Sequence, residues 1–204
     1  MSNTRPRAPI NEHADPLDID AGTLVRTESA PPGTIGLKGG SAKDGGASTD
    51  PVSYARTRSG QRVGDGECFT LADRALRASG LRSAEDFGVI TTTADYVWGT
   101  LVTLADVRAG DIIQFRDYRF DRRVETESAD GTAWSEDFQE RPHHTAIVES
   151  VDGAEITVLE QNMPRGAGVS RATLFFASGT SRNGRRTTTI TVQGQFWFYR
   201  PQPR

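Results

Sequence analysis

Three side chains of this sequence have the types that nucleophilic amide hydrolysis requires: the thiol of Cys68, the imidazole of His144 and the carboxylate of Glu160. In such chemistry a thiolate attacks a carbonyl carbon, a histidine accepts the thiol proton, and a third polar group orients the histidine. Cys68 is the only cysteine of the chain, so an internal disulfide is excluded. Because a lone cysteine is more often a buried structural residue than a nucleophile, its surroundings decide the interpretation.

The segment around Cys68 favours a reactive thiol. A glycine-rich approach over residues 64–67 ends at Cys68, and residues 68–79 predict a helix that stops at Gly80. A helix N-terminus has unpaired N–H groups and a partial positive charge, which lower the pKa of a thiol placed there. The glycines allow a sharp turn that leaves the sulfur accessible.

His144 and Glu160 lie at the ends of a predicted hairpin whose turn contains Asp152-Gly153, a dipeptide typical of hairpins. Side chains alternate along a strand, so a loop with an odd number of residues would put His144 directly opposite Glu160, with Cβ atoms about 5 Å apart. A two-residue loop would shift this alignment by one position. Either residue alone is more often solvated than functional, so the interpretation depends on their combination with Cys68.

No metal or other cofactor is expected. His143 and His144 are adjacent, and neighbouring residues of a strand point to opposite faces, which argues against a zinc site. Gly64 and Gly66 are not followed by the Lys-Ser/Thr pair of a phosphate-binding loop, so a nucleotide is not expected either.

Charge and hydropathy exclude several classes of partner. A net charge of −3 gives no general attraction to nucleic acid or to an anionic membrane. No stretch approaches the roughly 18 apolar residues of a membrane span. Residues 1–7 lack the apolar segment of a Sec signal, so we expect a chain made in the cytoplasm, with export by a non-Sec route left open.

Composition divides the chain into two regions. Every aromatic residue lies from Tyr54 onward, and the preceding residues are rich in Gly, Pro, Ser and Thr, which predicts a disordered tail over 1–52 and a folded domain over 53–204. Residues 117–142 mix charges with aromatic rings and predict a surface hairpin or flap, or a solvated loop with a few packed rings. A short helix is predicted at 54–58 and strands at 112–115, 145–151, 155–160, 172–176 and 187–199. Several antiparallel strands after a helix indicate the α+β class.

The order of these segments resembles the CHAP domains, a group within the papain-like NlpC/P60 superfamily of cysteine peptidases and amidases. The segments that carry the resemblance are Gly66-Glu67-Cys68-Phe69, Ala109-Gly110-Asp111-Ile112-Ile113-Gln114-Phe115, His144-Thr145-Ala146-Ile147-Val148, Ile156-Thr157-Val158-Leu159-Glu160-Gln161-Asn162 and Phe196-Trp197-Phe198-Tyr199-Arg200-Pro201. The resemblance covers about residues 54–202. It implies an α+β, papain-like fold of NlpC/P60 type, in which the helix that begins at the cysteine packs on an antiparallel sheet.

The same resemblance implies roles for individual residues. Cys68 would be the nucleophile and His144 the base, and Glu160 and Asn162 would orient the histidine or complete the polar network. Many CHAP domains carry Gln before the cysteine, whereas this chain carries Glu67, whose carboxylate would repel the negative charge that develops on the substrate oxygen. The backbone N–H of Cys68 would stabilise that charge instead.

Two functions from different classes follow. The first is a cysteine amidase or endopeptidase that acts on peptidoglycan or another peptide or amide substrate, in a cleft lined by Glu67, Tyr96, Trp98 and His143 together with the 117–142 segment. The second is a noncatalytic binding or scaffold module that keeps the CHAP-like fold, which Glu67 and the missing export signal favour. Alkylation of the thiol across pH separates them, because an activated thiol reacts well below pH 8.

Overall fold

The computed structural model describes residues 50–204, so most of the tail predicted over 1–52 lies outside the described residues. The last residues of that segment belong to the folded domain. Asp50 caps the first helix, α1 (Pro51–Arg56), because its side chain accepts hydrogen bonds from two backbone N–H groups of the first turn. Val52 is buried in the core. The folded domain therefore includes Asp50, and the predicted boundary between residues 52 and 53 falls inside α1.

The domain consists of two helices followed by one antiparallel sheet, which agrees with the predicted α+β class. The strand order is β1-β7-β2-β3-β4-β5, and β6 pairs with the outer part of β7. After α1 the elements are α2 (Cys68–Ala78), β1 (Thr100–Val102), β2 (Ile112–Ser128), β3 (Gly131–Asp152), β4 (Glu155–Glu160), β5 (Ser170–Phe175), β6 (Gly179–Asn183) and β7 (Arg186–Arg200). No helix within residues 50–204 is long and apolar enough to cross a membrane.

Helix α2 holds the cysteine at the end of the sheet. Its buried stripe, Leu71, Ala72, Ala75 and Leu76, recurs at helical spacing and packs on α1 and β3. The chain leaves the helix through Gly80, whose φ of 71° is the left-handed conformation that ends many helices. Because this stripe fixes the rotation of α2, the first residue of the helix lies at the edge of the helix–sheet interface.

The sheet has a core on each face and curls around one of them. On the face toward the helices, Ile112, Ile147 and Leu159 pack with residues of α1 and α2. On the other face, Phe176, which follows β5, packs against Phe198 of β7 with ring centroids 5.1 Å apart. Three strands separate β5 from β7 in the sheet, so this contact shows that the sheet curls into a half-barrel.

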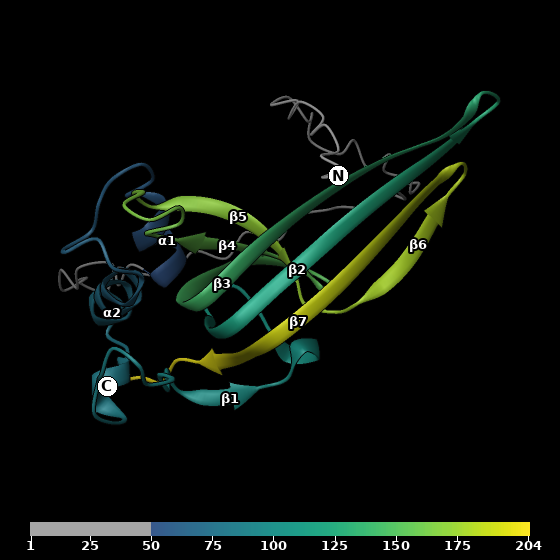
Figure 1. The fold of residues 1–204 in the computed structure, drawn as a ribbon. Coiled ribbons are helices and arrows are strands. Elements are labelled where there is room, and N and C mark those ends of the chain that lie inside the picture. The colour runs from purple at the N-terminus through teal and green to yellow at the C-terminus, as the bar shows by residue number, and fades with distance from the viewer. Residues whose placement is uncertain (1–49) are drawn as a thin grey trace, which may run out of the picture. The chain divides into compact units, whose positions relative to one another are not determined.

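The outer parts of β2 and β3 form a long arm. The two strands pair from Ile112↔Ile147 to Ser128↔Gly131 at the tip, with one interruption between Arg116↔His143 and Tyr118↔Arg141, and β6 and β7 widen the arm. Figure 1 shows both hairpins extending away from the helices. The predicted 117–142 segment is therefore a surface hairpin, formed by the outer parts of β2 and β3.

Candidate active site

The structure brings the side chains of Cys68 and His144 together from different elements. Cys68 is the first residue of α2 and is partly exposed, and its thiol interacts with the His144 imidazole, so that each group shifts the pKa of the other. His144 is buried on β3, with 4% of its surface exposed. Its Nε2 lies 2.9 Å from Oε2 of Glu160, which leaves Nδ1 as the nitrogen available to the sulfur. The three predicted residues thus lie together, with His144 between Cys68 and Glu160.

The charges of these three residues stabilise one another. Burial would raise the pKa of the Cys68 thiol, but the hydrogen bond and charge of His144 and the backbone N–H of Thr145 lower it below its usual value. Burial would likewise lower the pKa of His144, but the contacts with Cys68 and Glu160 raise it to about 9. These opposite shifts favour a thiolate next to an imidazolium, which is the reactive form of a catalytic cysteine.

The register of β3 and β4 does not place His144 directly opposite Glu160. The turn is the two-residue loop Gly153-Ala154, and the pairing shifts by one position at a bulge at Glu149. Extending the observed pair Ile147↔Leu159 puts Glu160 opposite Ala146, not opposite His144. Of the two loop lengths left open by the sequence, the structure has the two-residue loop, for which no direct pair was expected. The bulge restores the common face, so His144 reaches Glu160 diagonally, across a distance that long side chains span.

A fourth charged residue, Arg141, completes the buried network. Its Nε lies 2.8 Å from Oε2 of Glu160 and its Nη2 lies 2.5 Å from Oε1. Burial would raise the pKa of Glu160, but His144 and Arg141 together lower it, so the carboxylate stays ionised. Sequence reasoning missed Arg141, because strict alternation places it on the same face as His143.

A bulge in β2 explains this placement. Asp117 has a φ of 50°, and β2 gains one residue relative to β7 at this point, opposite Gly194. On the other side, Asp117 faces Pro142, the one position at which the β2–β3 ladder is interrupted. Beyond the interruption the side chains change face, so Arg141 and His144, three residues apart, contact the same carboxylate. The proline between them was the signal in the sequence.

The two residues after Glu160 hold the loop that carries the cysteine. The side chain of Gln161 is fully buried: its Oε1 accepts from Val63 N at 2.7 Å, and its Nε2 donates to Val63 O and to Glu67 O, the latter at 2.9 Å. Asn162 donates from Nδ2 to Oε2 of Glu67 at 3.0 Å. Asn162 therefore completes the polar network through Glu67, whereas no contact with His144 is present. Gln161 was not predicted.

A cleft of about 440 Å³ opens at Cys68. Glu67, Tyr96 and His143 line it, as expected, together with Phe69 and Ile90. The imidazole of His143 is held by a contact of 2.8 Å between its Nε2 and Ala94 O. The cleft thus combines aromatic and aliphatic walls with a carboxylate beside the sulfur.

Two expectations about the cleft are wrong. Trp98 is fully buried behind it, where its Nε1 donates to Gln114 Oε1 at 3.3 Å and its ring packs on Phe69. The 117–142 segment supplies none of the residues that line the cleft, because β2 and β3 carry it away from the helices. Trp98 therefore supports the wall of the cleft and does not face a substrate.

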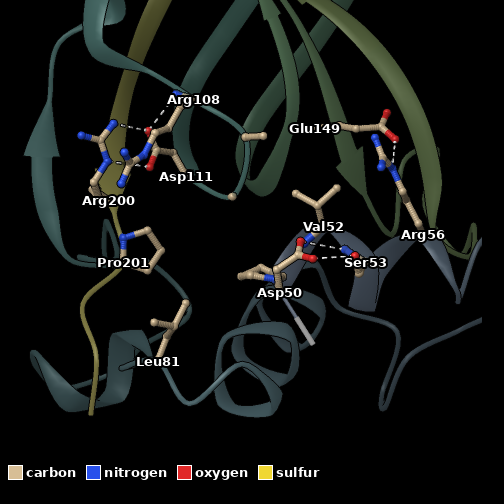
Figure 2. A pocket seen from close by; sticks show the side chains of 13 residues that line it. Asp50, Val52, Ser53, Arg56, Leu81, Arg108, Asp111, Glu149, Arg200 and Pro201 are labelled. Atoms are coloured by element: carbon tan, nitrogen blue, oxygen red, sulfur yellow. Dashed lines mark hydrogen bonds and ion pairs between the residues drawn. The ribbon is translucent and has the colours of Figure 1, made fainter. Parts of the chain in front are cut away.

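A second hollow, of about 530 Å³, lies between α1 and the ends of the sheet strands (Figure 2). One ion pair joins α1 to the sheet, Arg56 to Glu149 at 2.6 Å, and a second, Arg200 to Asp111 at 3.1 Å, lies on the sheet side of the hollow. No cysteine or histidine is among its lining residues. We interpret it as the seam that fixes α1 on the sheet. Among residues 50–204, no group of three His, Cys, Asp or Glu side chains has the arrangement of a metal site.

Comparison with known proteins gives one family. Residues 46–204 match the family described as the AIM3/BBC1 cysteine proteinase-fold domain, a segment that contains Cys68, His144 and Glu160. No curated protein matches the chain. Among solved structures, the crystal structure of Ly7917 is similar, with 23% sequence identity and a TM-score of 0.43. The similarity covers 70% of this chain and 61% of that one, so this chain spans less than two thirds of the length of Ly7917.

Proposed function

Since the chain belongs to the AIM3/BBC1 cysteine proteinase-fold family, we propose that its domain is a cysteine-dependent amide hydrolase of the CHAP type. One observation carries the proposal: the fold brings the thiol of Cys68 to the ring of His144, whose Nε2 lies 2.9 Å from the carboxylate of Glu160. A structural cysteine needs no such partner, whereas a nucleophile needs both an acceptor for its proton and a group that orients the acceptor.

In the proposed reaction, the Cys68 thiolate attacks the carbonyl carbon of the substrate amide, while its proton resides on His144. The backbone N–H of Cys68 lies at the first position of α2 without an intrahelical acceptor and donates to the developing oxyanion. His144 then protonates the leaving amine, and the C–N bond breaks to give a thioester. Water, deprotonated by His144, releases the acid and restores the thiol.

For the substrate we propose an amide bond of a peptide, with bacterial peptidoglycan as the first candidate because of the resemblance to CHAP domains. The apolar walls of the cleft, Phe69, Ile90 and Tyr96, suit the side chain or sugar-facing surface of an extended peptide. Its polar residues, Glu67 and His143, supply hydrogen-bond partners for the peptide backbone or for amino groups.

The test compares the wild type with Cys68→Ala. Purified peptidoglycan is incubated with each protein, and the released fragments are identified by mass spectrometry. We expect new amino and carboxyl termini with the wild type and none with Cys68→Ala, while both proteins show the same thermal unfolding. Full activity of Cys68→Ala would overturn the mechanism.

A noncatalytic binding module is the second candidate, and Glu67 is the observation that favours it. Glu67 lines the same cleft as Cys68, and a carboxylate there opposes negative charge on a substrate oxygen. Alkylation by iodoacetamide separates the two functions without any substrate. The hydrolase requires rapid alkylation of Cys68 well below pH 8, whereas a structural thiol in a binding module reacts slowly until the pH approaches 9.

A further inference from the structure

Arg141 and Glu160 form a buried, two-point ion pair directly behind His144. Arg141 has 3% and Glu160 1% of its surface exposed. Nη2 of Arg141 contacts Oε1, and Nε contacts Oε2, so the planar guanidinium faces the planar carboxylate with one nitrogen on each oxygen. Oε2 also contacts Nε2 of His144 at 2.9 Å. The carboxylate therefore has a single orientation in which both partners are satisfied.

The remaining donors of Arg141 fix the guanidinium itself. Nη1 donates to Glu140 O at 2.8 Å, and Nη2 donates to Oε1 of Gln139 at 3.0 Å. The side chain thus makes contacts with the backbone and with two other side chains, and it cannot rotate without losing several of them. Because Arg141 is fixed, it fixes the carboxylate of Glu160, and the contact of Oε2 with Nε2 fixes the imidazole of His144.

On its outer side the ion pair borders a cavity, toward which the Glu160 carboxylate could turn if Arg141 did not hold it. The cavity, of about 560 Å³, is lined by Arg141 and Glu160 as well as by exposed residues of β3 and β5. A carboxylate gains solvation when it turns toward water, so Glu160 without a partner on this side would be drawn away from His144.

We propose that Arg141 is a positioning residue of the active site: it holds Glu160 against the ring of His144 and keeps the carboxylate from turning into the outer cavity. This inference rests on the proposed function, since it assigns the orientation of the catalytic base. Arg141 contacts neither the sulfur nor the cleft and is not itself a catalytic residue.

Other charged groups surround the pair and enter the test. Tyr118 of β2 is influenced by both Arg141 and Glu160, but its hydroxyl donates to Phe175 O at 2.6 Å and burial raises its pKa, so it stays neutral. Glu140 of β3 and Arg171 of β5 line the outer cavity, and both are largely exposed. None of these three groups contacts the Glu160 carboxylate.

The test uses three arginine variants and the rate of Cys68 alkylation by iodoacetamide from pH 4 to pH 9. Arg141→Met removes charge and hydrogen bonds while keeping the length of the side chain. Arg141→Lys keeps the charge but not the two-point geometry. Arg122→Met is the matched control, because Arg122 lies on the same sheet, in the arm, and pairs only with Asp137.

We expect the acid limb of the alkylation profile to move upward by about one pH unit in Arg141→Met, because a released Glu160 is protonated more easily and no longer stabilises the imidazolium. At pH 6 this change corresponds to an approximately tenfold slower reaction. Arg141→Lys should lie between Arg141→Met and the wild type, and Arg122→Met should match the wild type. If Arg141→Met does not fold, as judged by circular dichroism, the displaced limb of Arg141→Lys gives the answer.

A second comparison isolates the route through Glu160. In the Glu160→Gln background, Arg141→Met should slow alkylation no further, because a positioning residue has no effect once the group that it positions is gone. An unchanged acid limb in both Arg141 variants, or an equal further loss in the Glu160→Gln background, would overturn the proposal.

The outcome is separable from that of the proposed function. Alkylation reports the protonation of Cys68 and needs no substrate. A displaced limb without peptide cleavage by the wild type overturns the hydrolase and supports the role of Arg141. If the wild type cleaves peptide and the acid limbs of the alkylation profiles of both Arg141 variants coincide with that of the wild type, only the role of Arg141 is overturned.

Discussion

The interaction between Cys68 and His144 lowers the pKa of the thiol and raises the pKa of the imidazole. Each partner moves the pKa of the other toward the charged pair, and Glu160 assists by stabilising the imidazolium. A thiol deprotonated by its neighbour is a better nucleophile at neutral pH than a free thiol. The chemistry of the site therefore depends on two contacts of His144, one on each ring nitrogen.

The first prediction concerns the pKa of His144. It should be near 9 in the wild type and lower in Cys68→Ala, because the thiolate that stabilises the imidazolium is gone. The titration of the ring, followed by NMR with ¹⁵N-labelled histidine, measures it. The folded pKa exceeds the unfolded value of 6.5, so the protonated ring stabilises the fold fully below pH 6.5, and this stabilisation is lost as the pH rises through 9.

His143→Gln serves as the control for this titration. His143 lines the cleft but makes its own contact with Ala94 O, so its removal should leave the pKa of His144 unchanged. An identical His144 titration in the wild type and in Cys68→Ala would contradict the ion pair.

At the scale of residues, chemical type together with position, a helix start for Cys68 and the ends of a hairpin for His144 and Glu160, was enough to propose these three side chains from the sequence. Type was not sufficient for Arg141 or Trp98. To predict Arg141, one would have to know that the side chains of β3 change face at Pro142. A tryptophan near a cleft looks the same in sequence whether it faces the cleft or supports its wall.

At the scale of elements, the end of β4 controls both halves of the site. Glu160 contacts the histidine, whereas Gln161 holds the loop between Val63 and Glu67 that leads into α2. One short strand thus fixes the distance between base and nucleophile. The sequence does not reveal this role, because it does not show whether a glutamine at the end of a strand is buried or solvated.

The second prediction follows from this arrangement. Gln161→Ala should lower the free energy of unfolding by about 3 kcal/mol, because buried backbone groups of Val63 and Glu67 lose their partner. It should also slow the alkylation of Cys68, since the loop before the helix is released. Urea unfolding and alkylation at pH 7 measure the two effects.

Asn162→Gly is the matched control. Asn162 has a φ of 70°, which glycine adopts without strain, and both of its side-chain hydrogen bonds, to Glu67 and from Gly166 N, are exposed, so the loss should stay below about 1 kcal/mol. Equal destabilisation by both substitutions would show that Gln161 is not the anchor of the loop.

The strands were predicted where apolar residues alternate and missed where they do not. The apolar strands before and after the turn at Gly153 lie in β3 and β4. In contrast, β6 has only exposed residues, and the register of the hairpin depends on a bulge at Glu149. Bulges and polar edge strands are set by contacts between distant segments, so periodicity within one segment does not reveal them.

At the scale of the molecule, the residues of both hydrophobic cores that lie within 50–204 begin at Val52. The third prediction is that a chain beginning at Asp50 folds and keeps a reactive Cys68. A chain beginning at Ser53 should unfold at lower temperature, with a loss of about 3 kcal/mol, because it lacks the Asp50 cap and the buried Val52 side chain.

Thermal unfolding by circular dichroism measures this difference, and alkylation at pH 7 verifies the site. Composition divided the sequence between residues 52 and 53, close to the start of the folded domain at Asp50 but not at it. One capping aspartate and one valine do not change the average composition of the surrounding residues. If the chain that begins at Asp50 fails to fold, residues before it contribute to the core.

The arm also determines how the domain moves in solution. At about 3.4 Å per residue, the 17 residues of β2 extend roughly 58 Å, whereas a compact sphere with the radius of gyration expected for this size, about 15 Å, is only about 40 Å across. A rod of this length increases hydrodynamic drag and makes rotational diffusion anisotropic. Fluorescence anisotropy decay of the domain should therefore contain more than one rotational correlation time, and the longest one should shorten when the arm is trimmed.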